Sequence, residues 1–315
     1  MKTVKIGDMS VPALAVGCRR FNNISVEDAD KYVRAALDMG ANYFDHADVY
    51  GGSLSETVFG GVLAIDPSLR DKMYIQSKCG IRKAMNAFDL STEYILSSVE
   101  GSLKRLNTDY LDVLLLHRMD ALMDPEEVAE AFGKLHQQGK VRAFGVSNAT
   151  PMQILLLKKH VTQPIVINQM QLSLAHCPMI AQGIYTNMDV KSAIDTDGSV
   201  LDFCRLHDIT IQTWAPLQFG YQKGVFLDHP DFPELNRVLG ELAEKYAVTK
   251  TAIALAWILR HPAKMQALTG TLKIGRLEDS LKAAEVELTR DEWYELFEAA
   301  GNHLPVNPQP NQARS

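Results

Sequence analysis

The chain has 315 residues, a length that a single α/β barrel domain can occupy. Hydrophobic residues make up 46% of it and charged residues 22%, which are ordinary values for a globular enzyme. The formal net charge of −6 gives no reason to expect nucleic acid or an anionic membrane as a partner. We therefore expect one domain over residues 1–315, with no nucleic-acid and no membrane partner.

The cysteine pattern and the N-terminus bear on the compartment. The four cysteines are widely spaced and form no C-x-x-C pair, which argues against a disulfide framework and a zinc ribbon. The N-terminal residues lack the apolar core of a signal peptide. No apolar run reaches the roughly 18 residues of a membrane span. These features predict a cytoplasmic protein with reduced thiols.

Short apolar runs alternate with helical patterns along most of the chain, as is typical of parallel strands covered on both faces. Repeated strand–helix alternation favours a (β/α)8 TIM barrel over a doubly wound sheet. We expect a small hairpin within residues 1–11, and an extra helix and a flexible tail (about 305–315) at the C-terminus. The expected barrel strands cover residues 14–16, 42–44, 73–75, 113–116, 143–146, 166–168, 210–213 and 266–268.

Capping signals mark several helices between these strands. Ser25, followed three residues later by Asp28, predicts a helix start with an acidic first turn. Residues 92–106 carry apolar side chains at helical spacing on one face. Asp124 precedes Pro125 as a cap followed by proline at the first helical position, and Gly139 is expected just past the end of that helix.

Two segments are longer than the strand–helix repeat requires. Residues 172–199 follow the sixth expected strand, and residues 218–233 follow the seventh. Long loops on such barrels usually carry function. We therefore expect both segments to carry function.

Four polar side chains lie at or beyond the ends of the second, third and fourth expected strands. They are Asp45, Tyr50, Lys78 and His117. In a parallel barrel the carboxyl ends of all strands meet at one face, so these groups should converge. An ammonium lowers the pKa of a neighbouring tyrosine, and a carboxylate keeps the ammonium charged. A histidine can orient a carbonyl oxygen by hydrogen bonding. This set predicts a tyrosine that protonates a carbonyl oxygen.

Each residue alone has a simpler interpretation, as a turn former, a solvated lysine or a loop histidine. A metal-dependent barrel hydrolase or aldolase remains an alternative, with His46 and Asp48 joining His117 as ligands. The absence of a further spaced His/Cys set disfavours it, so we expect no metal. A dinucleotide-binding Rossmann domain lacks its G-x-G-x-x-G fingerprint here.

The joint pattern resembles the aldo-keto reductase superfamily over roughly residues 3–300. The segment 44–51, Phe-Asp-His-Ala-Asp-Val-Tyr-Gly, looks like the family's D-x-A-x-x-Y-G region. The bacterial oxidoreductase subgroup carries Leu-His-Arg-x-Asp, which residues 116–120 match. The resemblance implies a (β/α)8 barrel, and it implies that Asp45, Tyr50, Lys78 and His117 form the catalytic tetrad with Tyr50 as the proton donor.

The resemblance also implies a nicotinamide cofactor, NADP(H) in preference to NAD(H). The segment 144–148, Phe-Gly-Val-Ser-Asn, is similar to the strand whose Ser and Asn contact the nicotinamide carboxamide. Trp214 stands where the family commonly has a tyrosine stacked on the nicotinamide, and the segment 270–276 resembles the one that binds the adenosine 2′-phosphate. The cofactor-binding residues implied in this way are Gly17, Ser147, Asn148, Gln169, Trp214, Pro216, Leu217, Gly270, Thr271, Lys273, Arg276 and Ser280.

Two departures from the family pattern concern the substrate wall and the adenine contacts. The first strand is followed by Gly17-Cys18-Arg19-Arg20, where the family often has an aromatic residue, so charge is added near the mouth. The frequent Glu-Asn after the phosphate segment is Asp279-Ser280 here. The expected activity is NADPH-dependent reduction of an aldehyde or ketone. The alternative is an NADP-binding regulatory protein of the same fold that acts through a protein partner.

Overall fold

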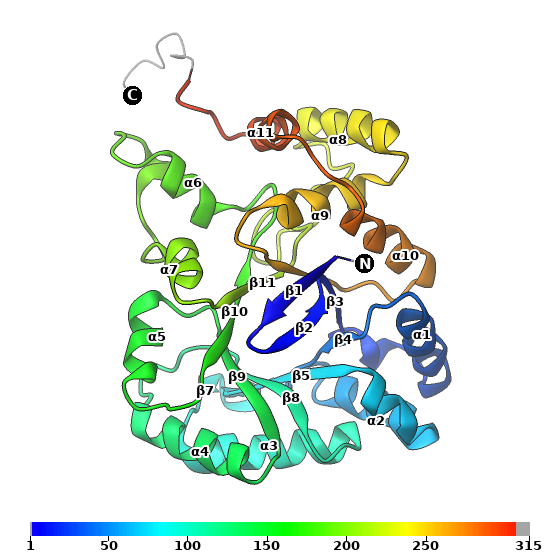
Figure 1. Cartoon of the computed structure of the whole chain (residues 1–315), viewed down its shortest axis with the longest axis vertical. Coiled ribbons are helices and arrows are strands. Elements are labelled where there is room, and N and C mark those ends of the chain that lie inside the picture. The colour runs from blue at the N-terminus through cyan, green and yellow to red at the C-terminus, as the bar shows by residue number, and fades with distance from the viewer. Residues whose placement is uncertain (1, 307–315) are drawn as a thin grey trace.

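The computed structural model describes residues 2–306. Its centre is a closed barrel of parallel strands in the order β10-β11-β12-β3-β4-β5-β8-β9, with helices on the outside (Figure 1). The predicted (β/α)8 barrel is thereby confirmed. Its strands are β3 (Leu14–Gly17), β4 (Tyr43–Asp45), β5 (Tyr74–Cys79), β8 (Leu111–Leu116), β9 (Val141–Ser147), β10 (Ile165–Gln171), β11 (Thr210–Trp214) and β12 (Gln266–Thr269).

The helices cover the barrel because their apolar faces pack on the outward side chains of the strands. The expected extra helix is α11, which follows the last barrel helix. The helices are α1 (Val26–Asp38), α2 (Leu54–Ile65), α3 (Thr92–Leu106), α4 (Pro125–Gln137), α5 (Pro151–Lys158), α6 (Pro178–Ile184), α7 (Val200–Leu206), α8 (Pro233–Tyr246), α9 (Lys250–Arg260), α10 (Ile274–Leu281) and α11 (Arg290–Ala299).

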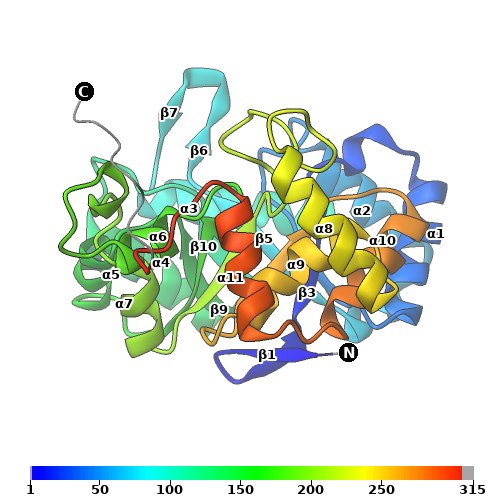
Figure 2. The same cartoon turned by 90° about the horizontal axis from the view of Figure 1, so that it is seen from above.

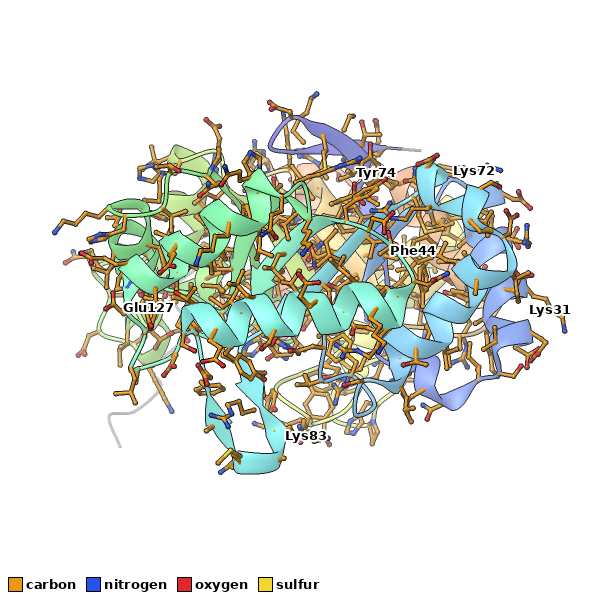
Figure 3. All side chains as sticks on the ribbon, turned by 90° about the horizontal axis from the view of Figure 1, so that it is seen from below. Lys31, Phe44, Lys72, Tyr74, Lys83 and Glu127 are labelled. Atoms are coloured by element: carbon orange, nitrogen blue, oxygen red, sulfur yellow. The ribbon has the colours of Figure 1, made fainter. Side chains whose placement is uncertain are left out.

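The predicted N-terminal hairpin consists of β1 (Thr3–Ile6) and β2 (Met9–Pro12), and it covers one end of the barrel (Figure 2). Thr210 donates its hydroxyl to the Lys5 carbonyl over 2.5 Å, which ties the hairpin to β11. The sequence did not predict a second hairpin, β6 (Ile81–Arg82) with β7 (Ala87–Phe88). It projects from the opposite end of the molecule and carries Lys83 (Figure 3).

Several strands are longer than the apolar runs suggested. β5 continues through Gln76, Ser77 and Lys78 to Cys79, because backbone pairing with β8 extends beyond the apolar residues. β4 likewise includes Asp45. Polar side chains that the sequence placed just past two strands therefore stand inside the barrel wall.

The predicted caps are present. Ser25 accepts a hydrogen bond from the Asp28 amide at the start of α1. Asp124 accepts one from the Glu126 amide at the start of α4, which begins with Pro125. Gly139, just past the end of α4, has a φ of +70°, a conformation that glycine adopts without strain.

The two long connections are only partly irregular. Residues 172–199 contain α6 and a short 3-10 helix, Lys191–Ala193. Residues 218–233 are held by a bridge between Gln218 and Val225. Most of the tail expected over about 305–315 lies outside the described residues.

The contact between α2 and α3 leaves no room for a side chain at Gly60. A Cβ atom there would lie 1.9 Å from the Arg105 carbonyl oxygen near the end of α3. Gly133 in α4 is the opposite case, because a Cβ atom there would meet nothing within 4 Å.

We expect Gly60→Ala to lower the free energy of unfolding by about 1–3 kcal/mol or more, because the two helices must move apart. Gly133→Ala should raise it by about 0.5–1 kcal/mol, because alanine favours a helix interior. Urea unfolding of both variants measures the contrast. Equal urea midpoints for the two variants would contradict the prediction, because α2 and α3 would then move apart without a loss of stability.

Candidate active site

A buried lysine holds the centre of the site. Lys78 projects from β5 with no exposure to solvent. Its ammonium donates to Asp45 Oδ1 over 2.6 Å, to the His46 carbonyl over 2.8 Å and to the Tyr50 hydroxyl over 3.1 Å. The three partners lie on β4 and the turn that follows it, so the pairing of β4 with β5 brings them together.

Tyr50 reaches this position on a tight turn. Its amide donates to the Ala47 carbonyl, and Gly51 follows with a φ of +59°. A Cβ atom on Gly51 would lie 2.5 Å from Asn22, so the close approach also requires glycine. The turn thereby presents the phenol to Lys78.

His117 completes the predicted group of four. It follows β8, and its amide donates to the Cys79 carbonyl. Its ring stands perpendicular to the Tyr50 ring, with 5.8 Å between the centroids. Burial holds the pKa of His117 well below 6.5, and the positive charges of Lys78, Arg118 and Arg19 act in the same direction. The imidazole is therefore neutral at neutral pH.

The prediction that Lys78 lowers the pKa of Tyr50 below that of a free tyrosine is wrong. Burial raises the pKa of Tyr50 above 10.0, and the ammonium of Lys78 opposes this without overcoming it. The reason is that desolvation penalises the phenolate more than one neighbouring cation favours it. Tyr50 therefore keeps its proton at neutral pH.

Asp45 accepts more hydrogen bonds than the sequence suggested. Besides Lys78, the side-chain amides of Gln76 and Gln169 donate to its Oδ1. Sequence reasoning assigned Gln169 to the nicotinamide and missed Gln76. A signal for Gln76 was present, because it lies two residues before Lys78 and so shares its face of β5.

Ser147, Asn148 and Trp214 lie together at the ends of neighbouring strands. Ser147 donates its hydroxyl to the Gln169 carbonyl over 3.0 Å, and the Asn148 amide donates to the Ser147 hydroxyl over 2.8 Å. The indole of Trp214 donates to Asn148 Oδ1 over 3.1 Å. Pro216 and Leu217 continue the chain after Trp214, the first buried and the second half-buried.

The remaining predicted cofactor residues gather around the end of β12. Gly17 of β3 pairs beside Asp45, and a Cβ atom on Gly17 would lie 3.4 Å from the Thr269 carbonyl oxygen. Gly270 and Thr271 follow β12 and lead into α10, with Lys273 and Arg276 exposed at its start. Ser280 is different: it is buried, and it donates its hydroxyl to the Arg276 carbonyl.

A cavity of about 410 Å³ opens at Arg118, the residue after His117. Arg118, Asn148, Gln171 and Trp214 contribute to its wall. The two long connections also contribute, through Thr196 and Asp197 from one and Tyr221 from the other. Sequence reasoning anticipated the loops but missed Arg118, Gln171 and His176 as lining residues.

The comparisons with known proteins fit this arrangement. A model of the aldo/keto reductase family matches residues 13–300. The chain belongs to the aldo/keto reductase family. It is an NAD(P)H-dependent oxidoreductase, and reduction of carbonyl compounds is the reaction that this membership supports.

Relatives of the reductase carry oxidoreductase names. It is 34% identical to the "uncharacterized oxidoreductase YcsN" of Bacillus subtilis, over 95% of this chain and 97% of that protein. It is also 34% identical to a 6-dehydroglucose reductase of Agrobacterium fabrum, over 85% and 86%. These names favour the enzyme over the regulatory alternative.

A solved structure supports the same assignment. The thermostable aldo-keto reductase Tm1743, in complex with the inhibitor epalrestat, superposes with a TM-score of 0.76. That match has 25% identity and covers 95% of this chain and 100% of the other. Within residues 2–306 of the reductase, no helix is long and apolar enough to cross a membrane.

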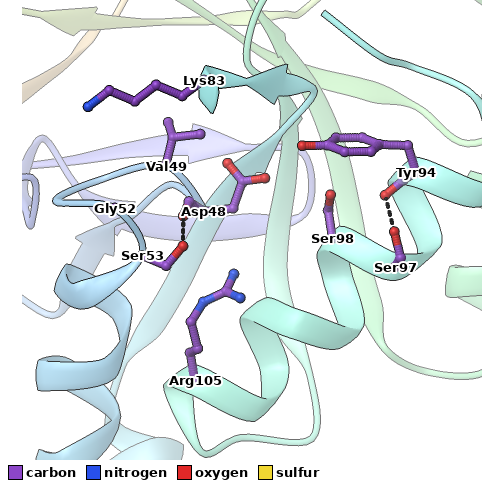
Figure 4. A pocket seen from close by; sticks show the side chains of 9 residues that line it. All are labelled: Asp48, Val49, Gly52, Ser53, Lys83, Tyr94, Ser97, Ser98 and Arg105. Carbon is purple, nitrogen blue, oxygen red and sulfur yellow. Dashed lines mark hydrogen bonds between the residues drawn. The ribbon is translucent and has the colours of Figure 1, made fainter. Parts of the chain in front are cut away.

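The alternative of a metal-dependent enzyme requires a group of metal ligands. Among the described residues, no three His, Cys, Asp or Glu side chains are grouped so that they could hold an ion. His46 packs its buried ring against Phe59, with 4.5 Å between the centroids. Asp48 instead faces a second cavity of about 330 Å³ between α2 and α3, near Tyr94 and Arg105 (Figure 4). Neither residue points to metal chemistry.

Asp48 makes the stability of the reductase depend on pH. Burial, reinforced by the neighbouring Glu56, raises the pKa of Asp48 from 3.8 to about 7. Between pH 3.8 and about 7, the folded protein therefore holds a proton that the unfolded chain releases. The resulting contribution to stability is complete below pH 3.8 and is lost as the pH rises through about 7.

We expect Asp48→Asn to remove this loss, because asparagine does not ionise. The gain in melting temperature over the wild type should be smallest below about pH 4, grow between about pH 4 and pH 7, and level off above that range. Thermal unfolding at a series of pH values measures the difference. A gain that does not change with pH would contradict the assignment.

Proposed function

We propose that the protein reduces an aldehyde or ketone to an alcohol with NADPH, and that Tyr50 is the proton donor. The observation that carries the proposal is the bond of 3.1 Å between the Lys78 ammonium and the Tyr50 hydroxyl, inside a buried set that includes Asp45 and His117. A bound nicotinamide supplies the hydride for the carbonyl carbon. The residues of this chain supply the proton and hold the carbonyl group in place.

Tyr50 is suited to act as an acid because it is protonated at neutral pH. Its raised pKa keeps the proton on the hydroxyl until the carbonyl oxygen gains negative charge. Lys78 then stabilises the phenolate that remains, and Asp45 holds Lys78 in place. The neutral His117 can donate a hydrogen bond to the same carbonyl oxygen and so orient it.

The residues at and after the ends of β3, β9, β11 and β12 fit a nicotinamide cofactor. Gly17 and Gly270 leave the mouth of the barrel free of side chains at the ends of β3 and β12. Trp214 offers an aromatic face, while Ser147 and Asn148 offer polar atoms at the neighbouring strand ends. We assign the ribose and adenine side to residues 270–276. Ser280 supports the end of that segment from inside, because its hydroxyl donates to the Arg276 carbonyl.

NADP(H) is preferred to NAD(H) in this proposal because of two cations. Lys273 and Arg276 are exposed near the start of α10, and neither takes part in an ion pair within residues 2–306. A 2′-phosphate is the feature that distinguishes the two cofactors, and paired cations bind it well. The substrate is a small carbonyl compound that enters beside Arg118 and Trp214.

We expect Tyr50→Phe to lower kcat for the NADPH-dependent reduction of 4-nitrobenzaldehyde by about 10²–10⁴-fold, the range in which a general acid contributes. NADPH binding, followed by its fluorescence, should persist. Tyr246→Phe is the matched control, because Tyr246 lies at the end of α8 and binds Glu292 instead. Full activity of the Tyr50 variant would refute the proton donor. Tight cofactor binding without turnover by the wild type would favour the regulatory alternative.

We expect Lys273→Ala and Arg276→Ala to raise KM for NADPH about tenfold each while KM for NADH changes little, since each removes one charged contact to a phosphate. Lys104→Ala, an exposed lysine on α3, serves as the control for net charge. Equal changes for both cofactors would contradict a 2′-phosphate site.

A further inference from the structure

The barrel interior beneath Asp45 is polar, although such interiors are normally filled with branched apolar side chains. Four glutamines, Gln76, Gln169, Gln212 and Gln266, project into it, and none is more than 3% exposed. Buried amides weaken a fold unless every polar atom finds a partner. The presence of four buried glutamines therefore calls for a structural or functional explanation.

The backbone register places the glutamines at one level. Gln212 of β11 is paired directly with Gln169 of β10 on one side and with Gln266 of β12 on the other. Gln76 of β5 is paired with Asp45 of β4. Because directly paired residues point to the same side of a sheet, the amides meet across the barrel.

The direction of every hydrogen bond is set from the closed end of the barrel. Gln266 Nε2 donates to the Pro12 carbonyl over 2.7 Å, and a carbonyl oxygen only accepts. The Gln266 oxygen is then free to accept from Gln212 Nε2, over 2.6 Å. This turns the oxygen of Gln212 towards the other two glutamines.

Gln212 Oε1 accepts from both Gln76 and Gln169, and each of these amides also donates to Asp45 Oδ1. Both N–H groups of each amide are used, one on Gln212 and one on Asp45. Without the Gln212 oxygen, the two amides would lose the acceptor that holds them in this orientation. The Tyr43 hydroxyl adds a bond of 2.7 Å to the Gln76 oxygen.

We propose that Gln212 is a positioning residue for Asp45: it holds the amide donors of Gln76 and Gln169 against the carboxylate that keeps Lys78 beside Tyr50. Gln266 and the Pro12 carbonyl set the direction of the chain. The inference rests on the proposed function, since it assigns Gln212 an effect on the same proton donor. Gln212 acts through Asp45 because it is fully buried and is not part of the cavity wall.

The first test is Gln212→Leu, which keeps most of the volume and removes the amide. With NADPH and 4-nitrobenzaldehyde, kcat should fall about tenfold, a part of the contribution of a general acid. KM for both substrates should stay within about twofold, because no contact to them is lost. Thr213→Val on the same strand is the matched control: its buried hydroxyl has no partner within the described residues, so kcat should not change.

The second test uses Gln212→Glu, with thermal unfolding recorded at each pH. A protonated carboxyl can still accept from Gln76 and Gln169 and donate to Gln266, whereas an ionised one cannot donate. Activity should therefore approach that of the wild type at low pH and fall as the new carboxyl ionises, at a pH that burial raises above the ordinary value. Tyr50 faces Lys78, Asp45, Arg19 and His117 in the wild type and in the variant alike. The effects of these groups therefore cancel in the ratio of the two pH profiles of activity, and the ratio reports the new carboxyl.

The third test is a double-mutant cycle. In an Asp45→Asn background, Gln212→Leu should cause little further loss of kcat if it acts through Asp45. Additive losses would overturn the proposal, as would a folded Gln212→Leu protein with wild-type kcat or a Gln212→Glu ratio that does not vary with pH. Failure of the proposed function is separate, because it would appear as activity of Tyr50→Phe.

Discussion

A lysine ammonium without access to water is the constraint on which the rest of the site depends. The desolvation of Lys78 is costly, and it is tolerated only because Asp45, the His46 carbonyl and the Tyr50 hydroxyl all accept from it. Removing one partner of such a buried pair typically costs about 3–5 kcal/mol. The arrangement of β4, β5 and the turn that carries Tyr50 therefore depends on the hydrogen bonds of the charged Lys78 ammonium.

Burial also decides where protons reside around Lys78. It raises the pKa of Tyr50 and lowers the pKa of His117, so both are neutral at neutral pH. A neutral phenol can donate a proton, and a neutral imidazole can donate a hydrogen bond without competing for that proton. Both protonation states follow from desolvation together with the fixed positive charge, and they suit the proposed transfer of a proton in a low-dielectric site.

Much of the fold was predictable because it depends on local patterns. Apolar runs located all eight barrel strands, and Ser25 and Asp124 located helix starts. The strand ends were less accurate, since Gln76 to Cys79 belong to β5 through backbone pairing that side-chain hydrophobicity does not report. The hairpin of β6 and β7 was missed because each of its strands has only two residues.

The sequence by itself determined which chemical groups meet in this protein. Asp45, Lys78 and His117 lie at or next to strand ends and Tyr50 lies in the turn after one, and parallel strands in a closed barrel bring such ends together. Only the tertiary structure decided the direction of the pKa shift of Tyr50, because burial depends on residues far along the chain. It alone decided that Gln169 faces Asp45, and that glutamines from four strands link that carboxylate to the Pro12 carbonyl. Hydrogen bonds between strands depend on register, and a strand's own sequence does not specify its register against its neighbours.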